Sequence, residues 1–106
     1  MANNYKNSKV DLTTTNSTVL YTAPSATTAI VRSILVSEDS GNADTLTMTL
    51  TAGTDVISLF KVKAVGANAT VEFLTQPLVV MESEILKVTA ATANRLHVTT
   101  SYLEVS

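Results

Sequence analysis

The sequence contains no cysteine and no tryptophan, and its 106 residues include only three glycines, two prolines, three tyrosines and two phenylalanines. Without cysteine the chain can form neither a disulfide nor a thiolate metal site, and it has no cysteine nucleophile. So few aromatic side chains argue against a sugar-binding cleft, which generally uses aromatic platforms. Charge is scarce too: seven Lys and Arg against nine Asp and Glu give a net charge of −2, whereas a nucleic-acid partner requires a basic face.

Long apolar runs are also missing. The first seven residues, MANNYKN, have no hydrophobic stretch, so we expect no secretory signal peptide. No segment reaches the length of a transmembrane helix, and there is no basic amphipathic segment, so we expect no membrane partner. The length predicts a single domain, whose core is only marginally stable when the domain is alone. Together with the missing signal peptide and membrane span, it predicts a soluble protein that is not secreted.

The abundant residues favour strands. Thr, Val, Ile, Tyr and Phe account for 40 residues, and such side chains fit a pleated, half-buried surface. Turn residues separate eight or nine short segments at intervals of roughly 8–12 positions, a spacing typical of a sandwich or barrel. We therefore predict an all-β fold, an antiparallel β-sandwich of about eight strands that is jelly-roll-like.

Alternation and turn residues predict the boundaries. Residues 1–8, which are rich in Asn, are predicted to form a flexible N-terminal arm, and residues 9–106 a single β-sandwich domain. The predicted strands are 9–15, 19–22, 28–38, 45–51, 56–65, 70–75, 78–81, 85–90 and 95–105.

Two of these strands carry apolar residues on both faces. Uninterrupted alternation over 28–38 places Ile30, Ile34 and Val36 on one face together with Arg32. Over 56–65 two inward-facing sets compete, and a bulge could reconcile them. Apolar residues on both faces are expected either for a central strand or for a strand at an interface.

No residue pattern predicts catalysis. The single histidine, His97, lies on an outward position of the last strand, and neither a nucleophile elbow nor a glycine-rich phosphate loop accompanies it. Glu82 and Glu84 could act as a glycosidase-like pair only beside a sugar-binding cleft. We expect no enzyme, no catalytic residue, no cofactor and no small-molecule substrate.

The segment from Glu38 to Asp44 is the clearest loop in the sequence. It holds Glu38, Asp39, Asn42 and Asp44 around Gly41, and calcium prefers such oxygen ligands, although the spacing does not match an EF-hand. The same residues are also the usual turn formers. We therefore predict a plain solvated loop with no metal, and leave cation binding as the open alternative.

The segment LYTAPSATTAIVRSILVS, residues 20–37, resembles a pattern found in small virion proteins of tailed bacteriophages, where it opens a β-sandwich. ANATVE (67–72), PLVV (77–80) and LHVTTSYLE (96–104) are similar to the same pattern, so the resemblance covers about residues 18–105. Such proteins are capsid decoration (cement), neck, tail or fibre-associated proteins. The resemblance brings no active-site residues with it.

The residues predict a non-enzymatic binding protein, and the resemblance implies a virion structural protein, a capsid cement protein that is made in the host cytoplasm and located in the virion. The expected partners are the major capsid protein or other virion proteins, and we expect a homo-oligomer, a dimer or trimer, from the edge strands and small size. The predicted contact residues are Tyr5, Arg32, Phe60, Lys61 and Tyr102. The alternatives are a tail, neck or fibre-associated component and a receptor- or carbohydrate-binding module.

Overall fold

The computed structural model describes residues 3–106, and Met1 and Ala2 of the predicted arm lie outside this range. The described residues form nine strands and no helix, and 64% of the residues are in strands. The strands are β1 (Asn3–Asp11), β2 (Thr18–Thr22), β3 (Thr28–Glu38), β4 (Asp44–Ala52), β5 (Asp55–Val65), β6 (Thr70–Glu72), β7 (Leu78–Val80), β8 (Ile85–Ala90) and β9 (Leu96–Val105). The predicted all-β class is confirmed.

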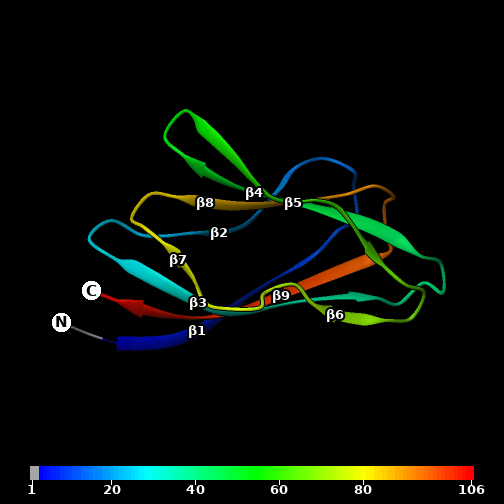
Figure 1. Ribbon diagram of the computed structural model, residues 1–106, viewed down its shortest axis with the longest axis horizontal. Helices are drawn as coiled ribbons and strands as arrows, with labels where there is room; N and C mark the ends of the chain where they lie inside the picture. Colours follow the sequence, from blue (N-terminus) through cyan, green and yellow to red (C-terminus); the bar gives the residue numbers. More distant parts are fainter. Residues whose placement is uncertain (1–2) are drawn as a thin grey trace.

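The strands make two antiparallel sheets that pack face to face (Figure 1). One sheet has the order β1-β9-β3-β6, with β7 also paired to β3, and the other has the order β2-β8-β4-β5. The strand pairs are nested along the chain, so that each pair lies between the two strands of the previous one, as in a long hairpin folded into a sandwich. From the outermost to the innermost they are β1–β9, β2–β8, β3 with β6 and β7, and β4–β5. This nesting is the jelly-roll arrangement, with β6 and β7 acting as two pieces of one broken strand.

The first strand begins earlier than predicted. β1 pairs with β9 without a register shift, from Asn3 opposite Val105 to Asp11 opposite His97. The prediction of an arm over residues 1–8 with a first strand from Lys9 is therefore wrong for residues 3–8. Asn-rich composition gave no sign of the strand because β1 is held mainly by main-chain hydrogen bonds, and nearly all of its side chains are exposed.

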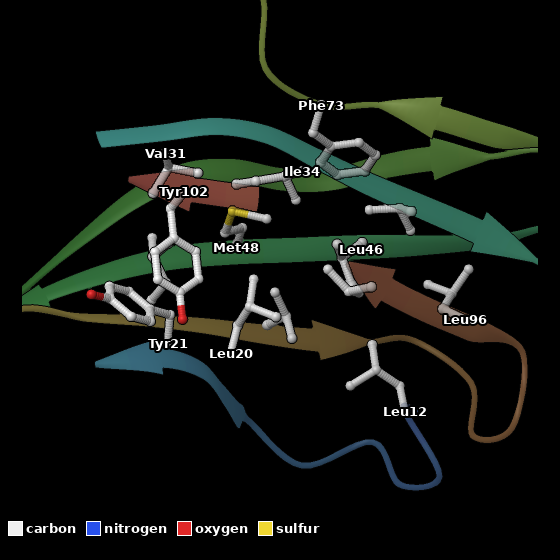
Figure 2. Close-up of a cluster of buried hydrophobic side chains, with 14 of the residues drawn as sticks. Leu12, Leu20, Tyr21, Val31, Ile34, Leu46, Met48, Phe73, Leu96 and Tyr102 are labelled. Carbon is white, nitrogen blue, oxygen red and sulfur yellow. The ribbon is translucent and has the colours of Figure 1, made fainter. Parts of the chain in front are cut away.

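The core follows the alternation in β4, β8 and β9. Leu46 and Met48 of β4 and Leu86 and Val88 of β8 point inward and are fully buried, opposite Leu96 and Val98 of β9. Figure 2 shows Tyr21 and Tyr102 side by side at one end of this core and Leu12 and Leu96 at the other, with the ring centroids of the two tyrosines 4.2 Å apart. In β9, Leu96, Val98, Thr100 and Tyr102 point inward, and His97 belongs to the outward set, as predicted.

A bulge in β3 changes which residues point inward. The register of β3 against β9 shifts between Val31 and Ser33, and beyond it Ile34 and Val36 are buried together with Val31. The prediction that Ile30 and Ile34 share one face is therefore wrong. An extra residue at a bulge reverses the alternation, and the sequence does not mark its position.

The opposite side of the sandwich is irregular. Two register shifts interrupt β4–β5 pairing, as a bulge between the competing sets in β5 requires, and Val62 of β5 has a positive φ of 53°. On the facing sheet, the chain between β6 and β7 leaves the ladder around Gln76 and Pro77, since proline has no N–H to donate. Phe73 fills the space behind this break and is buried.

Leu46 lies in the core, and its substitution tests how the core is packed. Replacing Leu46, which is fully buried, with Ala should lower the free energy of unfolding by about 2–5 kcal/mol in urea denaturation. Thr49→Ala, on the outer face of the same strand, should cost less than about 1 kcal/mol. Equal losses in the two variants would contradict the described inward face of β4.

Candidate functional site

The outer face of the five-stranded sheet carries a row of apolar side chains that crosses four strands. The register places Tyr5 of β1 beside Leu103 of β9, Leu103 beside Ile30 of β3, and Ile30 beside Val79 of β7. We call Tyr5, Leu103, Ile30 and Val79 the apolar row. Tyr5 is 77% exposed and Val79 49% exposed, whereas Leu103 and Ile30 are half-buried by their neighbours.

Further apolar and basic side chains extend this face. Met81, which follows β7, is 55% exposed, and Val105 lies next to Leu103 along β9 on the same face. On the other side of the row, Arg32 stands exposed at the β3 bulge and contributes to a shallow hollow of about 300 Å³ that is lined by Tyr5, Lys6, Asn7, Arg32, Ser101 and Tyr102. An exposed apolar row flanked by polar groups is typical of a protein-binding surface.

The predicted contact residues fall in three places. Tyr5 and Arg32 lie on this outer face. Phe60 and Lys61 lie on β5 of the other sheet, where the Phe60 ring packs edge-on against Phe73 at a centroid distance of 5.2 Å and Lys61 is exposed. Tyr102 points into the core and is only 6% exposed. The prediction that Tyr102 is a surface contact is therefore wrong.

Leu103, Ile30 and Val79 were missed as candidates. Each looks like an ordinary strand residue in the sequence, because only the pairing of β9, β3 and β7 brings them beside Tyr5. The one available signal is that 28–38 is apolar on both faces, which a single sequence cannot assign to an interface or to a central strand.

Beneath the row, a polar cluster ties β1 to both sheets. Glu104 of β9 is buried, and its carboxylate accepts hydrogen bonds from the Lys6 ammonium at 2.8 Å and from the Tyr21 hydroxyl at 2.5 Å. These donors, Lys6 first, lower the pKa of Glu104 despite its desolvation by burial. The hydroxyls of Ser8 and Tyr102 lie 3.0 Å apart and add a second link between β1 and β9.

Glu104→Gln tests this cluster. The folded-state pKa of Glu104 lies below its ordinary value of 4.5, so its ionisation stabilises the fold above pH 4.5 and the contribution is lost as pH falls through the lower folded value. The variant should lose about 1–3 kcal/mol of unfolding free energy at pH 7 and show a shallower loss of stability below pH 4.5. Asp55→Asn, at the exposed hairpin turn, should do neither; an unchanged pH profile of Glu104→Gln would contradict the described bonding.

The loop from Glu38 to Asp44 is organised by a carboxylate that is already saturated. Glu38 is only 2% exposed and accepts hydrogen bonds from the main-chain N–H groups of Ser40, Gly41 and Asn68 at 2.8, 3.0 and 3.1 Å, and from the Ser40 hydroxyl. These donors outweigh desolvation and lower its pKa to about 2. The hydrogen-bond donors around the Glu38 carboxylate therefore come from the folded loops themselves.

The other acidic side chains of the loop do not point toward the Glu38 carboxylate. Asp44 accepts a hydrogen bond from the Thr92 N–H at 3.1 Å, and Asp39 turns toward His97. Within residues 3–106 no three His, Cys, Asp or Glu side chains are placed to hold one metal ion.

Calcium should therefore leave this loop unchanged. We expect the Tm to be the same in millimolar Ca²⁺ and in EDTA, because the N–H donors around Glu38 repel a cation. Glu38→Gln should lower the Tm in both solutions equally. A calcium-dependent rise in Tm that Asp44→Ala removes would contradict this prediction.

His97 lies between two carboxylates instead of beside a nucleophile. Its Nε2 is 3.1 Å from Asp11 Oδ1 and its Nδ1 is 3.4 Å from Asp39 Oδ2. The carboxylates occupy opposite nitrogens of the ring and all three side chains are well exposed, so the cluster links β1, β9 and the β3–β4 loop at the surface. Such exposed pairs contribute at most about 1 kcal/mol.

The remaining acidic pair holds turns together. Glu82 accepts the Ala26 N–H and Glu84 accepts the Met81 N–H, each at 2.7 Å. Glu72 accepts the Ser33 hydroxyl and the Ile34 N–H beside the β3 bulge, and these bonds lower its pKa against the effect of desolvation. These carboxylates serve the backbone at turns and at the bulge.

No protein-family model matches the chain, and neither a curated protein nor a solved structure is similar to it beyond chance. Over residues 3–106, no helix has the length and apolar character that a membrane span requires.

Proposed function

We propose that this protein is a non-enzymatic structural component of a tailed-phage virion, a capsid cement protein that binds the head through the outer face of its five-stranded sheet. The apolar row carries this proposal. It presents Tyr5, Ile30, Val79 and Leu103 on four hydrogen-bonded strands, so the binding surface is rigid before a partner arrives. A preorganised surface loses little conformational freedom on binding.

The chemistry of the face suits a protein partner. Tyr5 offers a large side chain with one polar atom, which is the type enriched at interface centres. Arg32 at the margin is exposed and supplies a donor for carboxylate or carbonyl groups of the partner. Each contact is modest, and many copies on one shell multiply the stabilisation of the particle.

The glutamates that could take part in catalysis instead accept structural hydrogen bonds. Glu38, Glu72, Glu82, Glu84 and Glu104 all accept hydrogen bonds that hold loops, turns or strands. This supports a role in binding. The sequence resemblance to decoration, neck and tail proteins supports a location on a phage particle, and the major capsid protein is the proposed partner.

Val79→Asp is the sharpest test, because Val19 provides a matched control. Val79 is 49% exposed on the proposed face and Val19 is 50% exposed on the opposite sheet. Wild-type protein added to phage heads assembled without it should bind saturably and raise the temperature at which the heads open. Val79→Asp should weaken binding by about tenfold or more, since an unpaired carboxylate would be buried, whereas Val19→Asp should bind normally.

Other outcomes would redirect or contradict the proposal. Equal binding by both variants would exclude the outer face as the contact surface. Failure to bind heads together with co-fractionation on tails or necks would favour the tail, neck or fibre-associated alternative. Specific binding to glycans would favour the receptor- or carbohydrate-binding module instead.

A further inference from the structure

The four sheet edges differ in how well they are protected against pairing with another strand. The edge strand β2 is five residues long and its pairing shifts between Val19 and Tyr21, β5 is interrupted by two register shifts, and β6 and β7 have three residues each. β1 is different: it has nine residues, no proline and no register shift. Among the described strands, β1 is the one long, regular edge, and such an edge is a template for strand addition.

The hydrogen bonds of β1 define which of its main-chain groups are free. The Leu12 N–H donates to the Leu96 carbonyl at 3.0 Å, and this pair continues the β1–β9 register. In an antiparallel ladder, directly opposed residues exchange hydrogen bonds at every second position. The even-numbered residues of β1 therefore bond to β9, and the N–H and C=O groups of Tyr5, Asn7 and Lys9 point to the open edge.

Symmetry restricts how two β1 edges can join. Two identical antiparallel strands in one continuous sheet are related by a two-fold axis perpendicular to the sheet, so a residue must face its own copy at the centre. With the axis at Asn7, all nine residues pair, from Asn3 opposite Asp11 to Asp11 opposite Asn3. An axis at any other residue of β1 leaves some of the nine unpaired.

The facing side chains also favour the axis at Asn7. In this register Tyr5 faces Lys9 of the second copy, Lys6 faces Ser8, and Asn3 faces Asp11, so no like charges meet. An ammonium beside a tyrosine ring is attractive, and an amide can donate to a carboxylate. Placing the axis at Lys6 or Lys9 would instead put two ammonium groups opposite each other.

Lysine on an edge strand usually discourages pairing, but Lys6 is engaged here. Its ammonium lies 2.8 Å from the Glu104 carboxylate of its own chain. Lys9 reaches only the Asn7 side chain, 3.0 Å away on the outer face, which leaves the main-chain edge open. Asp11 is the one odd residue whose carbonyl is already used, by the Thr13 N–H at 3.0 Å, so the free ladder is centred on Tyr5 to Lys9.

We infer that β1 is the interface with a second copy of this chain: two copies join edge to edge, antiparallel about Asn7, and form one continuous sheet. Main-chain hydrogen bonds of Tyr5, Asn7 and Lys9 hold the pair. The two outer faces then lie side by side on the joined sheet, with Tyr5 of each copy beside the seam. This inference is independent of the proposed function, because it concerns the edge of the sheet and not its outer face.

The variant Asn7→Pro tests pairing through the β1 edge without changing the fold of the single chain. Proline removes the outward N–H at the centre of the interface and leaves the β1–β9 ladder intact, since the N–H of Asn7 does not point toward β9. In sedimentation equilibrium the full chain should have twice its mass of 11.2 kDa, and Asn7→Pro should sediment at 11.2 kDa with an unchanged circular dichroism spectrum. Asn7→Lys, which places two ammonium groups opposite each other, should also be a monomer, whereas Asn16→Lys in an exposed loop should remain a dimer.

A single engineered cysteine gives a positive test in a chain that has none. The Cα atoms of a hydrogen-bonded antiparallel pair lie about 5.5 Å apart, within the roughly 4.4–6.8 Å span of a disulfide. Asn7→Cys should therefore oxidise to a disulfide-linked dimer that keeps its circular dichroism spectrum. Thr54→Cys, at the exposed hairpin turn, should stay largely monomeric under the same non-reducing conditions.

Three results would overturn the inference. The first is a wild-type chain that is a monomer throughout the concentration range, even if it binds phage heads. The second is a dimer that persists in Asn7→Pro and Asn7→Lys. The third is a dimer that Val79→Asp abolishes and the Asn7 variants do not, which would place the contact on the outer face.

Discussion

The pairing of β9 with β1 on one side and β3 on the other is the constraint on which the rest of the structure depends. These two ladders are the longest in the five-stranded sheet, and they hold the C-terminal strand between the first and third strands of the chain. The inward residues of β9 complete the core against β4 and β8, and its outward residues complete the apolar row. One register therefore sets both the stability of the sandwich and the composition of its proposed binding face.

Three glutamates, of which Glu38 and Glu104 are buried and Glu72 is exposed, each accept several hydrogen bonds that hold separate parts of the backbone. Glu38 gathers the N–H groups of two loops, Glu72 covers the bulge in β3, and Glu104 receives Lys6 and Tyr21 where β1 meets β9. Each carboxylate has several donors, which offsets the cost of desolvation and keeps it charged in the fold. Of the nine acidic residues of the chain, these three therefore have structural roles.

The two sides of the molecule suit different roles. On one side, β1 is long and pairs without a register shift, and the outer face carries the apolar row, which favours contact with another protein surface. On the other side, bulges in β5 and the break between β6 and β7 interrupt the edge, and Lys63 lies over the Phe73 ring at 5.4 Å. The irregular side is protected against strand addition, whereas β1, on the regular side, is the edge that we propose to pair with a second copy.

The sequence by itself determined the fold class, the bounds of β3 and β8 and the outward position of His97, because these follow from local alternation and turn residues. It did not determine that residues 3–8 form a strand or that the alternation reverses in β3. The first depends on main-chain bonds to a distant strand, and the second on a single extra residue in the ladder. The apolar row was decided by tertiary structure alone, since pairing between distant segments brings Tyr5, Ile30, Val79 and Leu103 together.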